Sequence, residues 1–221
     1  KALTPIEFFN VNEGGTARLL EVAQKSAPQA RLVHISSLAA REPQLSPYAA
    51  SKRAGEDKLQ ILAGARDWIA LRPPAVYGPG DLALLPLFKA AKLGLSAYPA
   101  SPGARASTIH VADLAAAILA LLEAPTWQHR IIELDDGHSG GHDWAEINHT
   151  LGQCFGRRLW TLRLPRPLMS GIAQGVSLLS RATRTPQILS PDKIAELYHD
   201  DWVASGPKLD EITPWHAMFG L

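Results

Sequence analysis

The sequence is poor in several features that define specialised classes of protein. It holds one cysteine, Cys154, so these 221 residues cannot form an internal disulfide. Its charges nearly cancel, with 22 basic and 21 acidic residues, which argues against a nucleic-acid binder held by bulk charge. The longest unbroken apolar run, residues 114–122, is too short to span a bilayer. We therefore expect an ordinary globular protein of the cytoplasm, without nucleic-acid or membrane partners.

What the sequence does contain is an alternation of short apolar strands with helical segments. We expect strands over residues 31–35, 68–71 and 129–134, and helices over residues 12–27, 47–65, 82–93 and 111–123, the last buried on much of its surface. Such alternation is typical of a parallel sheet with right-handed crossovers. The fold class predicted is α/β, with residues 1–125 forming part of a doubly wound, Rossmann-type parallel sheet to which some later strands return.

Residues 126–221 are expected to form a smaller, mostly helical substrate-binding lobe. Here we expect a helix over 144–154 capped by Asp143, a short strand over 160–164, an apolar segment over 165–181 broken by Gly171 and Gly175, and a helix opened by Ser190 and Pro191. Residues 76–81 and 99–107 are expected to be loops. Because ligands often bind between two such lobes, the site should lie where they meet.

Three polar side chains converge around the second predicted helix. Ser37 follows directly after the strand over 31–35, and the carboxyl ends of strands carry the ligand sites of open α/β sheets. Tyr48 and Lys52 are four residues apart near the start of a helix that Ser46 can cap, so they share one face. A hydroxyl, a phenol and an ammonium at one point indicate acid–base chemistry on a carbonyl or an alcohol.

Tyr48-x-x-x-Lys52, with Ser37 eleven residues earlier, resembles the active-site signature of the short-chain dehydrogenase/reductase superfamily. Three further segments resemble its extended branch, the NAD-dependent epimerase/dehydratase group. They are VNEGGT at 11–16, LRPPAVYGPG at 71–80 and IHVADL at 109–114. The resemblance covers residues 11–123 and implies a Rossmann-type fold and an NAD(P)-dependent enzyme.

The resemblance implies a role for each matching residue. Tyr48 would exchange a proton with the substrate oxygen, Lys52 would lower its pKa, Ser37 would hold the substrate oxygen, and Asn12 would support a proton relay. A cation about 4 Å away is worth roughly 4 kcal/mol at an effective dielectric near 20, or about 3 pKa units. The cofactor, NAD or NADP, would be contacted by Ser36, Tyr48, Lys52, Pro73 and Val76. The substrate would be contacted by Ser37, Ala75, Ala106 and Ile109.

One part of the family's pattern does not occur in these residues. The glycine-rich strand–turn–helix that cradles the cofactor pyrophosphate would precede the helix over 12–27. We expect about 60–90 further residues there, at roughly 30 residues per βαβ unit. Without them, the strand over 31–35 should leave an open sheet edge, and the choice between NAD and NADP cannot be read. The 221 residues alone should bind a dinucleotide weakly.

Departures from the family pattern bear on the substrate. Nucleotide-sugar members often have asparagine where this chain has Ala75, and arginine where it has Ala106. We therefore expect hydride transfer with a small, fairly apolar carbonyl or alcohol. The alternatives are a sugar-nucleotide epimerase or dehydratase, and a non-catalytic NAD(P)-binding sensor or structural homologue. The apolar residues 165–179 could wall the substrate pocket or rest on a membrane surface.

Two further expectations concern partners and metals. Members of this branch often dimerise through the two helices around the serine strand, so we expect a homodimer through residues 12–27 and 47–65. His138 and His142 lie four apart, but the sequence offers no evident third ligand, so no metal site is expected.

Overall fold

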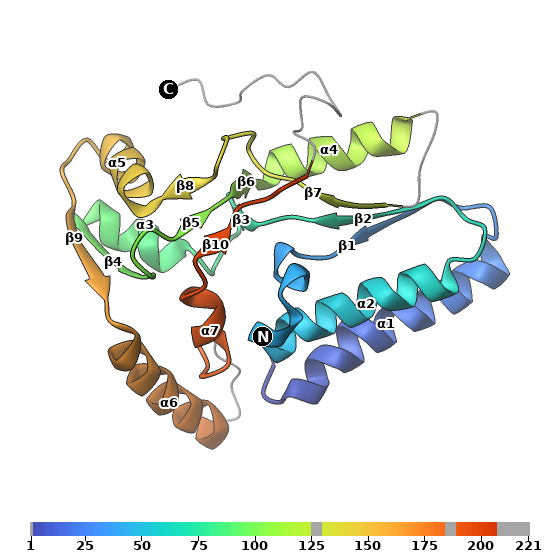
Figure 1. The fold of residues 1–221 in the computed structure, drawn as a ribbon, viewed down its shortest axis with the longest axis horizontal. Helices are drawn as coiled ribbons and strands as arrows, with labels where there is room; N and C mark the ends of the chain where they lie inside the picture. Colours follow the sequence, from blue (N-terminus) through green and yellow to red (C-terminus); the bar gives the residue numbers. More distant parts are fainter. Residues whose placement is uncertain (1, 125–129, 184–188, 207–221) are drawn as a thin grey trace.

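The computed structural model describes residues 2–124, 130–183 and 189–206 (Figure 1). Parts of the predicted segments, residues 125–129, 184–188 and 207–221, lie outside the described residues. The helices are α1 Pro5–Ser26, α2 Pro47–Leu62, α3 Leu85–Lys92, α4 Val111–Glu123, α5 Trp144–Cys154, α6 Arg166–Thr183 and α7 Lys193–Leu197, with short 3-10 turns Leu38–Arg41 and Pro43–Leu45. The strands are β1 Leu32–Ile35, β2 Trp68–Arg72, β3 Ala75–Tyr77, β4 Leu95–Pro99, β5 Arg105–Ala106, β6 Thr108–His110, β7 Arg130–Glu133, β8 His142–Asp143, β9 Trp160–Leu164 and β10 Asp201–Trp202.

A parallel sheet with the order β1-β2-β7 carries helices on both faces (Figure 1). Every residue of β2 is buried, as expected for a central strand covered on two sides. Ile69 and Leu71 of β2 pack in one core cluster with Leu114 of α4. On the other face, Trp68 and Ala70 pack with α1 and α2. The expected α/β, doubly wound parallel architecture is confirmed.

The open sheet edge expected at the serine strand is present. Within the part of the chain that the structure describes, β1 pairs with β2 alone. The buried Nε2 of His34, in the middle of β1, has no hydrogen-bond partner among these residues. An unpaired parallel edge of this kind is a place where a further strand can add.

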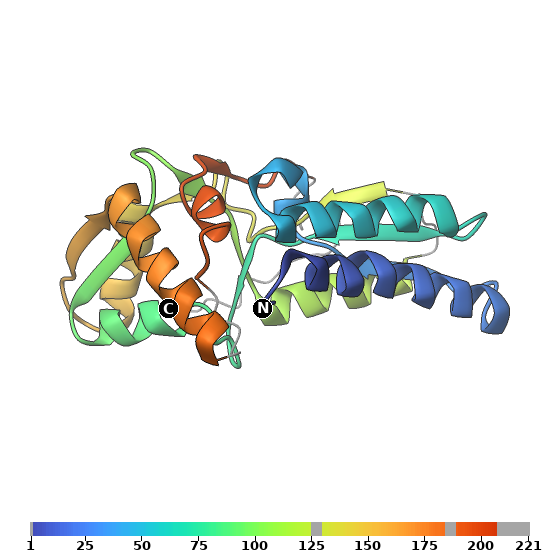
Figure 2. The same ribbon diagram turned by 90° about the horizontal axis from the view of Figure 1, so that it is seen from below.

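The second lobe is built from small sheets and from helices α3, α5, α6 and α7 (Figure 2). Strand β4 pairs in parallel with β9, and β5 lies between β8 and β10. Strand β7 returns from the later half of the chain to the sheet of β1 and β2. Elements α3, β4 and β5 of this lobe precede residue 125, and the division of the chain near that residue stays a prediction.

Several element boundaries differ from those expected. Helix α1 begins at Pro5 rather than at Asn12, because Pro5 is a good first helical residue and Phe8 of the added turns packs edge-on against Tyr48, with ring centroids 5.7 Å apart. Helix α7 begins at Lys193, two residues after Pro191. In α4, Leu119 and Leu122 are exposed, so burial is confined to one side of the helix.

Three segments expected to be irregular contain regular structure: the glycine-broken segment over 165–181, the loop over 76–81, and the loop over 99–107, where β5 pairs with β8 and β10. Helix α6 runs unbroken through Gly171 and Gly175, because its Met169 and Ala173 are buried against α7. A helical glycine costs only about 1 kcal/mol, which such packing offsets. In the expected loop over 76–81, β3 pairs with β6, a contact between segments more than 30 residues apart that periodicity cannot show.

Candidate active site

Local sequence fixes the start of α2, the helix that carries the tyrosine and the lysine. The Ser46 hydroxyl oxygen accepts the backbone N–H of Ala49 at 3.0 Å, and Pro47 occupies the first helical position, as predicted. Asn12 of α1 donates its amide N–H to the Ser51 hydroxyl at 2.8 Å, and Ser51 donates in turn to the Tyr48 carbonyl at 2.8 Å. Asn12 lies in the middle of α1, and through these two hydrogen bonds it stabilises the turn of α2 that carries Tyr48.

The close approach of α1 to α2 depends on one glycine (Figures 1 and 2). Gly55 is buried on α2, and a Cβ added there would lie 2.8 Å from the carbonyl oxygen of Asn12. No side chain larger than hydrogen fits without moving one helix. The contact fixes the position of Tyr48 relative to α1.

Ser37 and Tyr48 meet at the carboxyl end of β1, where both line a cavity. Burial raises the pKa of Tyr48 above its usual value. A side-chain hydrogen bond with Ser37 opposes this effect, and the nearby charge of Glu196 adds to it. The phenol is consequently protonated at neutral pH and can donate a proton.

Lys52 lies on the same face of α2, one turn beyond Tyr48. Its ammonium donates to the carbonyl oxygen of Ile35 at 3.3 Å, at the end of β1. Burial lowers the pKa of Lys52, and the charge of Glu56 partly restores it. The expectation that Lys52 lowers the pKa of Tyr48 differs from the structure, where burial outweighs any such effect. The cation over the Tyr48 ring is Lys193, 5.4 Å from its centroid.

Beneath these residues lies a buried ionic network that sequence reasoning missed. Glu56 is fully buried and receives two hydrogen bonds from the Arg72 guanidinium, at 2.8 and 2.6 Å. The Ser36 hydroxyl donates to the same carboxylate at 2.5 Å. Arg72 also lies 3.5 Å from Glu133 of β7. The network joins α2, the end of β1, and strands β2 and β7, so it holds the segment of Ser36 and Ser37 in place.

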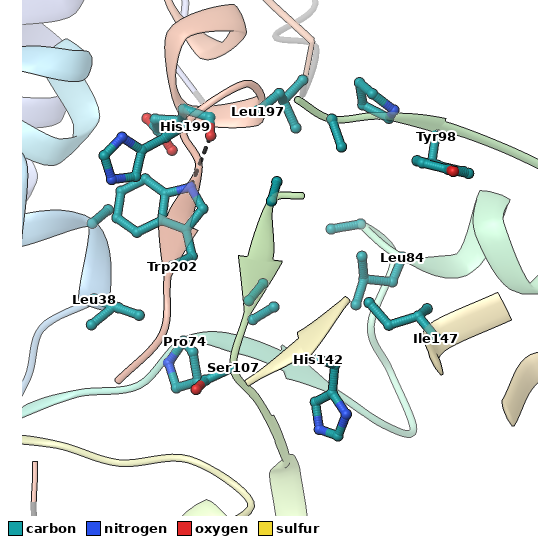
Figure 3. Close-up of a pocket in the computed structure, with 18 of the residues that line it drawn as sticks. Leu38, Pro74, Leu84, Tyr98, Ser107, His142, Ile147, Leu197, His199 and Trp202 are labelled. Atoms are coloured by element: carbon teal, nitrogen blue, oxygen red, sulfur yellow. Dashed lines mark hydrogen bonds between the residues drawn. The ribbon is translucent and has the colours of Figure 1, made fainter. Parts of the chain in front are cut away.

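The cavity has a volume of about 580 Å³ and lies between the two lobes (Figure 3). Figure 3 shows Trp202 and His199 on one side of it, with Tyr98 and Ile147 on the opposite side. Most of its lining is apolar: Leu38, Ala39, Pro74, Ala75, Val76, Ala83, Leu84, Leu87, Ala97, Pro99, Ala100, Ala104, Ala106, Ile147 and Leu197.

Some of the residues expected to contact the substrate or the cofactor line this cavity, and others do not. Ala75, Val76 and Ala106 line it. Ile109 does not, because it is 0% exposed and packs in the core beside α4, so it cannot reach a ligand there. Pro73 is buried and accepts the Leu38 backbone N–H at 2.9 Å, which places it behind the cavity wall.

Helix α7 of the second lobe reaches back to the start of α2. The Ser46 hydroxyl donates to the buried Glu196 carboxylate, which also pairs with Lys193. Lys193 and Glu196 both line the cavity. The indole N–H of Trp202 donates to the carbonyl oxygen of Glu196 at 2.8 Å (Figure 3). Through Glu196, α7 of the second lobe is therefore in contact with Ser46, at the start of the turn that carries Tyr48.

A third possible metal ligand joins the two histidines considered above. His138, His142 and Glu146 bring ligand atoms within 4.8 Å of one another. The imidazole rings are stacked, 4.2 Å apart and 16° from parallel, so their in-plane lone pairs do not converge on one point. Glu146 pairs with Arg105 at 3.2 Å, and His142 with Asp136 at 2.6 Å. These partners occupy the groups that a metal would need.

The fold and the site define a class of protein, and a comparison of sequences identifies it. The model of the NAD dependent epimerase/dehydratase family matches residues 1–133. The chain belongs to this family. It is 38% identical over 221 residues to the ceramide reductase of Caulobacter vibrioides (strain NA1000 / CB15N), covering all of this chain and 67% of that protein.

Solved structures with the same fold are more distant in sequence. A putative epimerase from Burkholderia cenocepacia J2315 matches 94% of this chain and 69% of its own, with a TM-score of 0.62 and 18% identity. MoeE5 in complex with UDP-glucuronic acid and NAD matches 69% of this chain and 57% of its own, with a TM-score of 0.58 and 22% identity. Human epimerase family protein SDR39U1 with NADPH matches 89% of this chain and 78% of its own, with a TM-score of 0.60 and 20% identity.

Proposed function

We propose that this protein is an NAD(P)-dependent reductase of a ketone carried by a long, apolar, ceramide-like substrate. The observation that carries the proposal is the cavity, where Ser37 and Tyr48 are set among mostly apolar side chains. Apolar walls with a few convergent polar groups are the usual form of a site for an apolar ligand. The 38% identity to a ceramide reductase supports the same class of substrate.

The chemistry of the chain's own residues favours reduction. In the proposed reaction, the Ser37 hydroxyl donates a hydrogen bond to the substrate carbonyl oxygen, and Tyr48 gives that oxygen a proton as it becomes an alcohol. The raised pKa of Tyr48 keeps the phenol protonated at neutral pH, as a proton donor requires. The positive charge of Lys52 then stabilises the phenolate that this proton transfer leaves on Tyr48.

The residues present suit the nicotinamide end of NAD or NADP. The bound cofactor would supply the hydride that reduces the carbonyl carbon. An ammonium has three N–H donors, so the half-buried Lys52 can bind ribose hydroxyls while it keeps its hydrogen bond to the Ile35 carbonyl oxygen. Ser36, Pro73 and Val76 would shape this end of the site, as the family resemblance implies.

The sugar-nucleotide alternative needs a cation for the pyrophosphate, and the cavity wall offers Lys193, which already pairs with Glu196, and Arg105. The Arg105 guanidinium already donates to the carbonyl oxygens of Gly140 and Gly141, both at 2.6 Å, and pairs with Asp143 and Glu146. A phosphate would have to displace these partners. The arrangement therefore favours the apolar substrate.

The test is turnover by the purified full-length protein, followed by nicotinamide absorbance. A long-chain N-acylated amino ketone should be reduced, whereas UDP-sugars should give no product. Tyr48→Phe should lower kcat by about 10²–10⁴-fold, the usual share of a general acid. Tyr98→Phe is the matched control, since it removes a hydroxyl from the side of the same cavity that lies opposite Trp202 and His199, and it should keep most of the activity.

Other outcomes would contradict the proposal. Epimerisation or dehydration of a UDP-sugar without ketone reduction would establish the alternative chemistry. Tight cofactor binding with no turnover of any ketone would favour a sensor or structural role. Undiminished activity of Tyr48→Phe would remove Tyr48 from the mechanism.

We also propose a homodimer through the outer sides of α1 and α2. Apolar side chains are exposed there: Ile6, Val11, Leu19, Val22 and Ile61. Val11 and Val22 lie three helical turns apart on one stripe of α1, as a helix-pairing seam requires. Light scattering at micromolar concentration should give the mass of two chains, and Val11→Asp should shift it toward one.

A further inference from the structure

Helix α6 exposes an uninterrupted apolar face on the outside of the second lobe. Leu168, Ile172, Gly175 and Leu179 follow the i, i+4, i+7, i+11 spacing of one helical stripe, and all four are exposed. Leu178, Pro167 and Gly171 flank the stripe and are exposed as well. Apolar surface gathered on one face in this way marks an interaction site rather than chance exposure.

The opposite side of α6 is already used. Met169 and Ala173 are buried against Ile194 of α7, together with Leu197. Leu197 also lines the active-site cavity. Helix α7 therefore separates the cavity from α6, and Figures 1 and 2 show α6 at the periphery of this lobe. A partner bound to the outer face of α6 would lie one helix away from the substrate.

The charged side chains in the sequence around α6 are basic and not acidic, which indicates an anionic partner. Between Glu146 and Asp192 the sequence has no acidic residue. The same stretch contains six arginines: Arg157, Arg158, Arg163, Arg166, Arg181 and Arg184. The first four are exposed, and within the described residues none of those four forms an ion pair with an acidic side chain. Trp160, at the start of β9, is 67% exposed, and tryptophan is enriched at membrane–water interfaces.

We propose that α6 docks this protein on an anionic lipid surface, with its apolar face in the headgroup boundary and the flanking arginines on the lipid phosphates. An amphipathic helix with basic flanks binds a bilayer by burying apolar area and by attracting anionic lipid. Among the described residues, no helix combines the length and hydrophobicity needed to cross a membrane. The proposal revises the expectation of no membrane partner and goes beyond the proposed reaction, since docking requires no turnover.

The experiment is sedimentation of the purified full-length protein with vesicles. Binding should be strong to vesicles of phosphatidylcholine with 30% phosphatidylglycerol, weak to phosphatidylcholine alone, and should fall as salt rises from about 0.05 to 0.5 M, where charges are screened. Leu179→Asp should weaken binding about tenfold or more, because it puts a charge where docking would bury an apolar side chain in the headgroup boundary. Leu119→Asp on α4 is the matched control, since both leucines are 61% exposed, and it should bind as the unaltered protein does.

Three results would overturn the proposal. The unaltered protein could fail to bind anionic vesicles at low salt, or Leu179→Asp could bind as well as Leu119→Asp. Alternatively, Leu179→Asp could lower the mass measured by light scattering, which would assign the face to a second copy of the chain. Reduction of a short-chain, water-soluble ketone should be equal in both variants, so that a failure of docking is distinguished from a failure of the proposed reaction.

Discussion

Glu56 should be among the costliest single residues to neutralise in this protein. Its buried carboxylate accepts two hydrogen bonds from Arg72 and one from Ser36. Breaking a buried ion pair from one side costs about 3–5 kcal/mol, because it leaves the other charge uncompensated. Glu56→Gln keeps one acceptor oxygen, and Glu133 still lies 3.5 Å from Arg72, so we expect the lower end, about 3 kcal/mol. For a chain of this length the melting temperature should fall by about 6–12 °C.

Urea unfolding followed by circular dichroism measures this cost. Glu13→Gln is the control, since Glu13 forms the exposed pair with Lys58 at 3.4 Å, worth at most about 1 kcal/mol. The double variant Glu56→Leu/Arg72→Met should recover most of the loss, because an apolar pair can replace a buried ion pair without penalty. The reasoning is refuted if Glu56→Gln and Glu13→Gln cost the same, or if the double variant is less stable than either single one.

Smaller perturbations test other contacts. Gly55→Ala should cost about 1–3 kcal/mol in urea unfolding, since its methyl meets the Asn12 carbonyl at 2.8 Å, whereas Gly171→Ala, with open space around it, should not destabilise. Burial raises the pKa of Tyr48, so the rate of ketone reduction should not change with pH near neutrality. In rate–pH profiles, the rate of alcohol oxidation should still be rising at a pH above the ordinary tyrosine pKa of about 10. Calorimetry should find only weak NAD binding to these 221 residues alone, and a micromolar Kd would contradict that.

The features that sequence reasoning predicted well are those that local chemistry decides. Ser46 and Pro47 start α2 because a hydroxyl cap and a fixed φ act within one turn. Asp143 starts α5 with a reciprocal capping box to Glu146, again within three residues. The short apolar strands β1, β2 and β7 are separated by clear turn signals, and their parallel pairing follows from the intervening helices.

The features that escaped prediction depend on residues distant in the sequence. Strand β4 pairs with β9, and α6 stays helical through two glycines, only because of partners brought there by the fold. Glu56 was within reach of sequence reasoning, since it lies one turn after Lys52 on the same face of α2. Lys193 was not, because nothing in the sequence relates α7 to Tyr48, 145 residues earlier in the numbering.

Ser46 makes both a local contact, as the cap of α2, and a distant contact, with α7. Variants of Ser46 can therefore separate the effects of these two contacts. Its hydroxyl caps α2 by accepting from Ala49, and it donates to Glu196 of the second lobe. Ser46→Ala loses both contacts, and the lost cap alone should cost about 1 kcal/mol. Ser46→Gly loses the same contact with Glu196 but costs only a few tenths of a kcal/mol at the cap.

The two variants should therefore differ in stability and agree in kinetics. Glu196 belongs to the wall of the cavity, so loosening it should raise KM for the ketone by a similar factor in Ser46→Gly and Ser46→Ala. If KM rises only in Ser46→Ala, the kinetic effect comes from fraying of the turn that carries Tyr48. In that case the contact between α7 and α2 would not position the substrate, and the second lobe would be held by its other contacts alone.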